Sequence, residues 1–119
     1  MTIEIESLRP PAGGSPRFEG YLYGASASSF VVMSPPGTGA DKHRHPYDET
    51  FIVLSGRIEF IVDGVMETIE GGHITVVPPN TWHEFKNRSS VPCLMVSIHP
   101  NDRIIQEDWS EAVHGVAKA

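Results

Sequence analysis

Apolar residues along the chain recur mostly at every second position, or in short runs that Gly, Pro, Asn and Asp interrupt. A period of two is typical of β-strands, since alternate side chains of a strand face the same side of a sheet. The pattern predicts an all-β domain with strands at residues 3–8, 20–23, 30–34, 50–54, 57–62, 65–69, 74–77, 83–86 and 94–98. Asp63-Gly64 separates two of these strands and predicts a two-residue hairpin, because a type I′ turn needs positive φ at both central residues.

The same pattern divides the chain into three parts within a length near the mode for one domain. Residues 1–19 combine the first predicted strand with a flexible, Pro- and Gly-rich connection, and residues 20–100 hold the strands of a sandwich closed into a barrel. Residues 101–119 predict a short helix over 101–109, capped by Asn101 or Asp102, and a tail at 115–119 that buries too little to stay ordered. Four apolar residues are expected to cover the barrel side of this helix: Ile104, Ile105, Trp109 and Val113.

Three histidines and one glutamate stand at spacings that suit a metal site. His43 and His45 are two positions apart and share one face of a strand, and Glu49 joins them if the chain stays extended. His83 follows a Pro-Pro-Asn turn at the start of a later strand. Three imidazoles and a carboxylate suit a divalent transition metal, so we expect one ion of Fe, Mn, Ni, Cu or Zn, among which ligand softness does not choose.

Residues 37–56 and 72–87 resemble the two conserved motifs of the cupin superfamily. Gly, His, His, Glu and Gly recur in the first motif, and Gly, Pro, a turn, His and Asn recur in the second. The one departure is Asn80 where the family usually has Gly, and Asn tolerates the left-handed backbone that such a turn requires. The resemblance implies a double-stranded β-helix, the jelly-roll barrel of cupins, followed here by a short C-terminal helix. It also implies the metal ligands His43, His45, Glu49 and His83.

The other three histidines lie outside these motifs, and we expect none of them at the metal. His73 follows Gly71-Gly72 and is expected to be a turn residue, and His114 is expected to be solvated in the tail. His99 precedes Pro100 at the end of the last apolar strand. It could line the mouth of the barrel, but a histidine outside the site is the favoured interpretation.

Residues that share parity with the ligands are candidates for a substrate pocket. Phe51 and Val53 follow Glu49 at even spacing, and Phe85 follows His83; Met33 and Met95 are further candidates. Each of these side chains could equally fill the barrel. The predicted lumen has no Arg or Lys cluster of the kind that binds a phosphosugar, so a neutral, aromatic or carbonyl-bearing molecule that chelates the metal fits better.

Composition narrows the possible partners and compartment. A formal charge of -6 argues against nucleic acid and anionic membranes as partners. The single cysteine, Cys93, excludes an intrachain disulfide, and its apolar surroundings favour an inert core thiol. The N-terminus is acidic and alternating where a signal peptide would be basic and then apolar, and no run approaches about 20 apolar residues, so we expect a cytoplasmic protein.

The cupin resemblance leaves three functions open. The favoured one is an oxygenase-type enzyme in which Glu49 is a metal ligand first and a catalytic base second, as in cupin dioxygenases. The second is an enzyme without redox chemistry, such as an isomerase, decarboxylase or cyclase that uses the metal as a Lewis acid. The third is a small-molecule binding module, although sensor cupins usually lack the full ligand set and precede a helix-turn-helix.

A homodimer is expected on two grounds. The alternating N-terminal strand on a loose hinge could add to a partner's sheet, as edge strands often do. The residues at 50–54 also predict an apolar outer face that a monomer would expose.

Overall fold

The computed structural model describes residues 1–118, with side chains described as far as Val113. The strands are β1 (Arg17–Phe18), β2 (Ser28–Ser34), β3 (Gly39–Arg44), β4 (Glu49–Ser55), β5 (Arg57–Val62), β6 (Val65–Glu70), β7 (His73–Val77), β8 (His83–Lys86), β9 (Cys93–His99) and β10 (Glu107–Asp108). Two short 3-10 helices, η1 (Ile5–Leu8) and η2 (Gly20–Leu22), precede β2, and one α-helix, α1 (Trp109–Lys118), follows β10. No helix among the residues described is long and apolar enough to cross a membrane.

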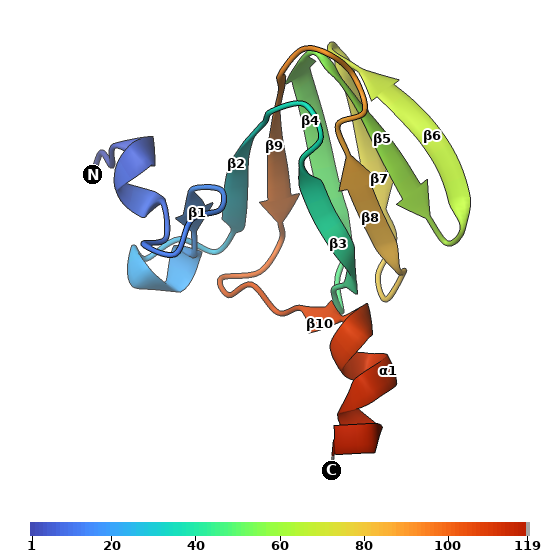
Figure 1. Cartoon of the computed structure of the whole chain (residues 1–119). Helices are drawn as coiled ribbons and strands as arrows, with labels where there is room; N and C mark the ends of the chain where they lie inside the picture. The colour runs from blue at the N-terminus through green and yellow to red at the C-terminus, as the bar shows by residue number, and fades with distance from the viewer. Residues whose placement is uncertain (119) are drawn as a thin grey trace.

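The strands form two antiparallel sheets that face each other (Figure 1). Sheet A has the order β1-β2-β9-β4-β7, and sheet B has the order β10-β3-β8-β5-β6. Helix α1 extends away from one end of this barrel (Figure 1). The arrangement confirms the predicted all-β class with one short C-terminal helix.

The core lies between the sheets and is made by alternate residues of the central strands. Phe51 on β4 and Phe60 on β5 face each other across it, with ring centroids 4.8 Å apart in an edge-to-face arrangement. The other fully buried apolar side chains are Val53, Ile58, Val77, Cys93 and Met95. Burying a side chain of the size of Phe51 contributes about 1.5–3 kcal/mol, so this cluster holds the two sheets together.

The outer faces of the two sheets differ in chemistry. On sheet A, Ile52 of β4 is the cross-strand partner of Val96 on β9, and exposed apolar residues surround this pair. These are Met33, Leu54, Ile74, Val76 and Ile98. The outer face of sheet B carries charged residues, among them Glu59, Glu84 and Lys86. Among the residues that the structure describes, the larger group of exposed apolar side chains therefore lies on sheet A, while Val65 and Met66 are exposed on β6 of sheet B.

The predicted strands from residue 30 onward are confirmed by β2 and by β4 to β9. The hairpin turn is confirmed as well, because Asp63 and Gly64 have φ values of 50° and 77°. The apolar pattern did not predict β3, whose glycine and charged residues interrupt the alternation, although the metal motif placed His43 on a strand.

Two predicted N-terminal strands are wrong. Residues 3–8 and 20–23 contain the 3-10 helices η1 and η2. Alternation alone does not make a strand, because a strand also needs a neighbour for its backbone groups. In η2 the backbone N–H groups of Leu22 and Tyr23 instead bond to carbonyls three positions earlier.

The helix predicted over 101–109 is also wrong, since α1 begins at Trp109 and runs through residues expected to form a disordered tail. Tertiary hydrogen bonds take up the backbone of the preceding segment: Ile104 N–H donates to the Glu19 carboxylate, and Ile105 N–H donates to the Tyr47 hydroxyl. Of the apolar residues expected to cover the barrel, Ile105, Trp109 and Val113 are exposed.

Candidate metal centre

The four predicted ligands meet at the end of the barrel from which α1 extends. His43 near the end of β3 and His83 at the start of β8 are directly paired across sheet B. Their nearest potential ligand atoms, with those of His45 and Glu49, all lie within 4.8 Å of one another, and all four residues are buried. The chain does not stay extended through this motif: it leaves sheet B after Arg44, and Glu49 begins β4 in sheet A. The site therefore takes its side chains from both sheets.

Backbone carbonyls fix the orientation of the three imidazoles. Nδ1 of His43 bonds to the Asp41 carbonyl at 2.6 Å, Nδ1 of His45 to the Ile105 carbonyl at 2.8 Å, and Nδ1 of His83 to the Thr81 carbonyl at 2.9 Å. A carbonyl oxygen only accepts, so Nδ1 carries the hydrogen in each ring. When such a ring is neutral, the lone pair of Nε2 is free to bind a metal ion.

The contacts among these atoms favour a cation at their centre. Oε1 of Glu49 lies 2.9 Å from Nε2 of His83 and 3.2 Å from Nε2 of His45. Nε2 of His45 is buried and makes no hydrogen bond of acceptable geometry. A carboxylate oxygen and an unprotonated ring nitrogen repel each other at such distances unless a proton or a metal ion lies between them. The residues present thus fit a divalent ion.

Electrostatics keep two of these groups in the form that a metal ion binds. Burial lowers the pKa of His43 from 6.5 to about 4, so this imidazole is neutral at neutral pH. Burial by itself would raise the pKa of Glu49, but contacts with His45, His83 and His99 outweigh it and hold that pKa below its ordinary value. The carboxylate is therefore ionised at neutral pH.

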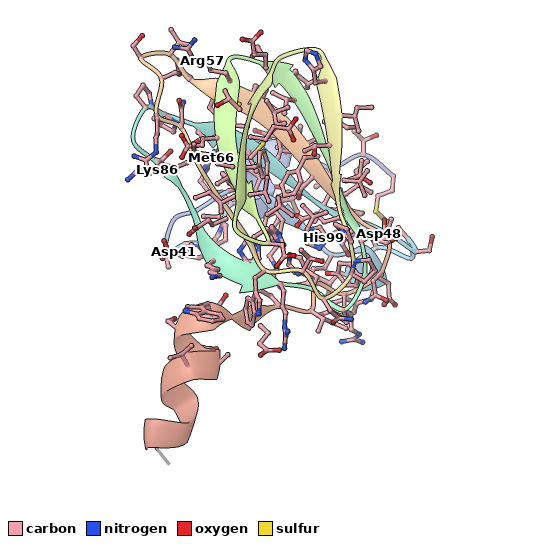
Figure 2. The ribbon with its side chains drawn as sticks, turned by 90° about the vertical axis from the view of Figure 1, so that its right-hand side faces the viewer. Asp41, Asp48, Arg57, Met66, Lys86 and His99 are labelled. Carbon is pink, nitrogen blue, oxygen red and sulfur yellow. The ribbon has the colours of Figure 1, made fainter. Side chains whose placement is uncertain are left out.

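The structure adds two residues, His99 and Tyr47, to the surroundings of the four predicted ligands. His99 is fully buried, with Nε2 2.9 Å from Oε2 of Glu49 and Nδ1 2.6 Å from the hydroxyl of Tyr47. Figure 2 shows His99 at the end of the barrel nearest α1, opposite the end that holds Arg57. The expectation that placed His99 outside the site is wrong. The sequence did contain a signal for this position: Met95, Ser97 and His99 occupy alternate positions of β9, so all three face inward.

A family model for the cupin domain matches residues 30–99, which is more than half of the chain. The chain belongs to the cupin family. Among its curated relatives are the endoribonuclease YbeY of Myxococcus xanthus, with 32% identity over 57% of this chain and 23% of that protein, and protein SchB of Streptomyces halstedii, with 31% identity over 56% and 49%. A third, polyketide synthase CurC of Streptomyces cyaneus, has 30% identity over 56% and 44%. The chain spans less than half the length of each of these relatives.

Solved structures share the fold of this cupin at lower identity. A double-stranded beta-helix protein from Klebsiella pneumoniae superposes with a TM-score of 0.72 at 20% identity, covering 90% of this chain and 95% of that one. The oxalate decarboxylase of Lactobacillus farciminis, in a formate complex, gives 0.82 at 18% identity over 95% of this chain and 37% of that one. The Bacillus subtilis oxalate decarboxylase, described with Mn(II) centres, gives 0.77 at 18% identity over 97% and 36%. These likenesses confirm the double-stranded β-helix fold.

The predicted pocket residues differ in how deeply they are buried and in whether they lie near the four candidate ligands. Phe51, Val53 and Met95 are fully buried in the core, and the Phe51 ring lies 6.3 Å from that of His83. Phe85 is half-buried against Phe60. Met33 is 53% exposed on the outer face of β2, because Val32 and Ser34 take the inward positions, so the structure does not bring it to the site.

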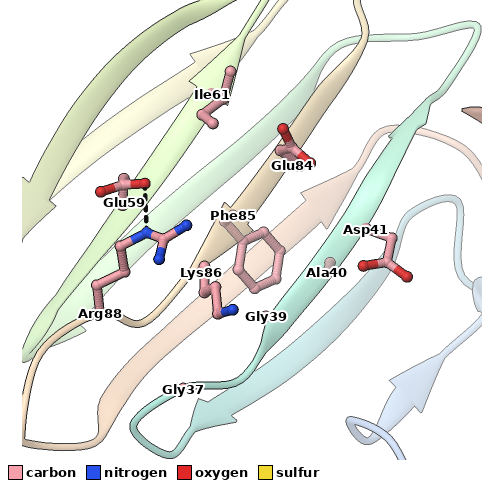
Figure 3. A pocket seen from close by; sticks show the side chains of 10 residues that line it. All are labelled: Gly37, Gly39, Ala40, Asp41, Glu59, Ile61, Glu84, Phe85, Lys86 and Arg88. Carbon is pink, nitrogen blue, oxygen red and sulfur yellow. Dashed lines mark hydrogen bonds and ion pairs between the residues drawn. The ribbon is translucent and has the colours of Figure 1, made fainter.

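A separate groove of about 330 Å³ lies along β3, β8 and β5, and none of the four candidate ligands lines it. Figure 3 shows its charged rim, where Arg88 pairs with Glu59 at 2.9 Å, and Phe85 beside it. Of the remaining histidines, His73 was expected to be a turn residue but is the first residue of β7; its side chain is exposed, and its Nδ1 bonds to the Glu70 carbonyl. The side chain of His114 lies outside the described residues.

Proposed function

We propose that this cupin binds one divalent transition metal ion through His43, His45, Glu49 and His83, and acts with it on a small molecule that chelates the metal through oxygen. The observation that carries the proposal is the meeting of Oε1 of Glu49 with the Nε2 atoms of His45 and His83 in a buried site. When bound, such an ion supplies a Lewis acid that polarises a chelating oxygen, and a redox-active ion adds the capacity to activate dioxygen.

The surroundings of the site favour a neutral, carbonyl-bearing or aromatic substrate. Phe51, packed against His83, is the nearest of the aromatic core residues. The closest cations by sequence, Lys42 and Arg44, lie over the rings of Trp109 and Trp82 instead. A substrate phosphate would therefore find no free cation of this motif beside the metal ligands.

Glu49 is the proposed catalytic residue. Its carboxylate is ionised at neutral pH and buried, so one oxygen can hold the metal while the group accepts a proton from a bound substrate. With Fe or Cu in the site, we propose an oxygenase-type reaction as the first candidate. Its test is oxygen uptake with flavonols, β-diketones and catechols, using protein loaded in turn with Fe, Mn, Ni and Cu. The oxygenase proposal fails if no form consumes oxygen with any of them.

A second candidate is a reaction without oxygen, such as decarboxylation or cyclisation of a β-carbonyl compound. Two observations favour it: the relatives that match at 30–31% identity include a polyketide synthase, and oxalate decarboxylases share the fold. The Mn(II) centres of one neighbour make Mn a natural first ion to load. The test is product analysis under anaerobic conditions with the same β-diketones and with oxalate.

The metal site itself is tested by elemental analysis of protein purified without added metal. His45→Ala and His83→Ala should each lower the metal content, with His73→Ala as the matched control. A doubly substituted protein that keeps full occupancy would reject the site. The ribonuclease activity named for the Myxococcus relative is not proposed, because this chain covers 23% of that protein and carries a net charge of -6.

A further inference from the structure

His99 is a fourth histidine of the site that does not take part in the four-residue cluster. Its ring is fully buried and packs edge-to-face on His45, with centroids 4.6 Å apart. Each of its nitrogens faces one polar atom: Nδ1 the hydroxyl of Tyr47 at 2.6 Å, and Nε2 the Oε2 atom of Glu49 at 2.9 Å. The second contact is close but poorly aligned, and Nε2 has no other hydrogen-bond partner.

The hydrogen assignment of His99 is opposite to that of the three candidate ligands. The Tyr47 oxygen already accepts the N–H of Ile105 at 3.2 Å, so its own hydrogen is available for Nδ1 of His99. Nε2 then carries the hydrogen and faces a carboxylate that only accepts. The reverse tautomer would set a nitrogen lone pair against the ionised Glu49 at 2.9 Å, which is repulsive.

We propose that His99 is a positioning residue that donates from Nε2 to Oε2 of Glu49, so that the carboxylate binds the metal through Oε1 alone, and that Tyr47 fixes the His99 ring for this task. The inference rests on the proposed metal site. Partners of this kind fix the orientation of metal ligands and tune the ion, and a buried N–H without another acceptor requires such a partner.

This arrangement determines how many coordination positions remain for the substrate. A six-coordinate ion with four single-atom protein ligands keeps two positions for a molecule that chelates through two oxygens. A carboxylate that binds through both oxygens would fill one of them. His99 thereby keeps open the second position that a bidentate oxygen chelator needs, whereas a ligand that binds through one atom needs only one position.

The test compares substitutions at His99 and Tyr47 in the metal-loaded protein. His99→Phe removes the donor, His99→Gln keeps an amide N–H close to the position of Nε2, and Tyr47→Phe removes the hydroxyl while keeping the ring that stacks on His45. His73→Phe is the control, because His73 is exposed and bonds only to a backbone carbonyl. The measurements are Mn(II) affinity, the infrared separation of the two carboxylate stretches on metal binding, and binding of acetylacetone and of azide to the Cu(II)-loaded protein.

We expect His99→Phe to weaken Mn(II) binding by about 10–100-fold, with a smaller loss in Tyr47→Phe. The carboxylate stretches should move closer together in His99→Phe, as for a carboxylate bound through two oxygens, and acetylacetone binding should weaken more than azide binding. His99→Gln should restore the wild-type infrared separation, and His73→Phe should match the wild type throughout.

Several outcomes overturn the inference. A folded His99→Phe with wild-type infrared separation and chelator binding does so, as does a Cu(II) spectrum that shows four histidine nitrogens in the wild type, since His99 would then be a ligand. If His99→Phe does not fold, Tyr47→Phe decides, and unchanged metal affinity and infrared separation there reject the inference. Wild-type protein that takes up no divalent metal rejects the proposed function as well, whereas normal uptake with no effect of either substitution rejects this inference alone.

Discussion

The backbone carbonyl of Ile105 accepts a hydrogen bond from Nδ1 of His45 at 2.8 Å, although 60 positions separate the two residues. The N–H of the same residue donates to the Tyr47 hydroxyl. Strand β10, which begins two residues later, pairs with β3, and Trp109 packs edge-to-face on Trp82. The C-terminal segment thus orients His45, one of the four candidate metal ligands, without supplying a candidate ligand of its own from the side chains that the structure describes.

Removing residues 101–119 should therefore weaken metal binding, even though all four candidate ligands remain. Losing the Ile105 carbonyl frees the His45 ring, and we expect an affinity loss of about 10–100-fold by isothermal titration with Zn(II). Removing residues 110–119 alone is the matched control and should leave the affinity unchanged. Equal affinities for the two truncated proteins would contradict the role of Ile105.

The free energy of unfolding of the metal-free protein should decrease as the pH is lowered into the acid range. The pKa of His43 is about 4 in the fold and 6.5 as its ordinary value, so the unfolded chain takes up this proton first, and stability is lost as pH falls from about 6.5 to about 4. The loss from His43 is on the order of 3 kcal/mol. The lowered pKa of Glu49 acts in the same direction, with stability lost as pH falls below about 4.5.

Urea unfolding in the presence of a chelator measures this pH dependence. His43→Gln should flatten the change between pH 6.5 and pH 4, whereas His73→Gln should leave it as in the wild type. A wild-type slope in His43→Gln would show that another group takes up the proton.

Asn80 has φ of 56°, and its N–H donates to the His45 carbonyl at 2.7 Å. The prediction that Asn supports the left-handed turn of the second motif is confirmed. Asn80→Gly should retain the stability of the wild type, while Asn80→Ala should lose about 1 kcal/mol, because a Cβ disfavours this conformation and Ala lacks the local polar contacts of Asn. Thermal unfolding of the two variants side by side decides the point, and equal losses would contradict it.

A homodimer remains a prediction, and the structure narrows its basis. Exchange of an N-terminal strand loses its support because η1 lies where that strand was expected, but the apolar outer face of sheet A stands. Val96→Lys at the centre of that face should convert a dimer into a monomer in sedimentation, since a buried unpaired charge is costly. Thr68→Lys on β6 of sheet B is the control. A wild-type monomer at micromolar concentration would reject the dimer.

Glu49→Gln separates the two proposed roles of that residue. The amide still offers a carbonyl oxygen to the metal but no comparable base, so turnover should fall far more than metal affinity. Glu49→Asp, which keeps the charge on a shorter side chain, is the companion variant. Parallel losses of affinity and turnover in Glu49→Gln would make Glu49 a ligand only.

The sequence predicted the strands whose apolar alternation matches the side that faces the core in the structure. His43, His45, Glu49 and His83 could be located because the two motifs combine ligand type with spacing. Tyr47 gave no such signal, since it lies in the loop between β3 and β4, where no periodicity indicates which way a side chain points. Its role depends on Ile105 and His99, both of them more than 50 positions away.

The errors at the two ends have different physical causes. Residues 1–8 form only local hydrogen bonds and have no strand partner among the residues described, whereas residues 101–109 make contacts that the sequence pattern does not contain. Ser28 Oγ, for example, donates to the Asn101 carbonyl at 2.8 Å, and the Glu19 carboxylate accepts from Ile104 N–H. Such bonds hold the segment before α1 in an irregular conformation, which the periodicity of apolar residues could not predict.

Cys93 and His99 occupy the two ends of β9, about 20 Å apart along the strand. The Cys93 thiol is fully buried, and burial raises its pKa, so a thiol-specific reagent reacts only when that end of the barrel opens. The labelling rate at Cys93 consequently reports how often the barrel opens at the end remote from the candidate metal centre. If divalent metal lowers this rate, the two ends of the barrel open as one cooperative unit. If the rate is unchanged, the two ends open independently.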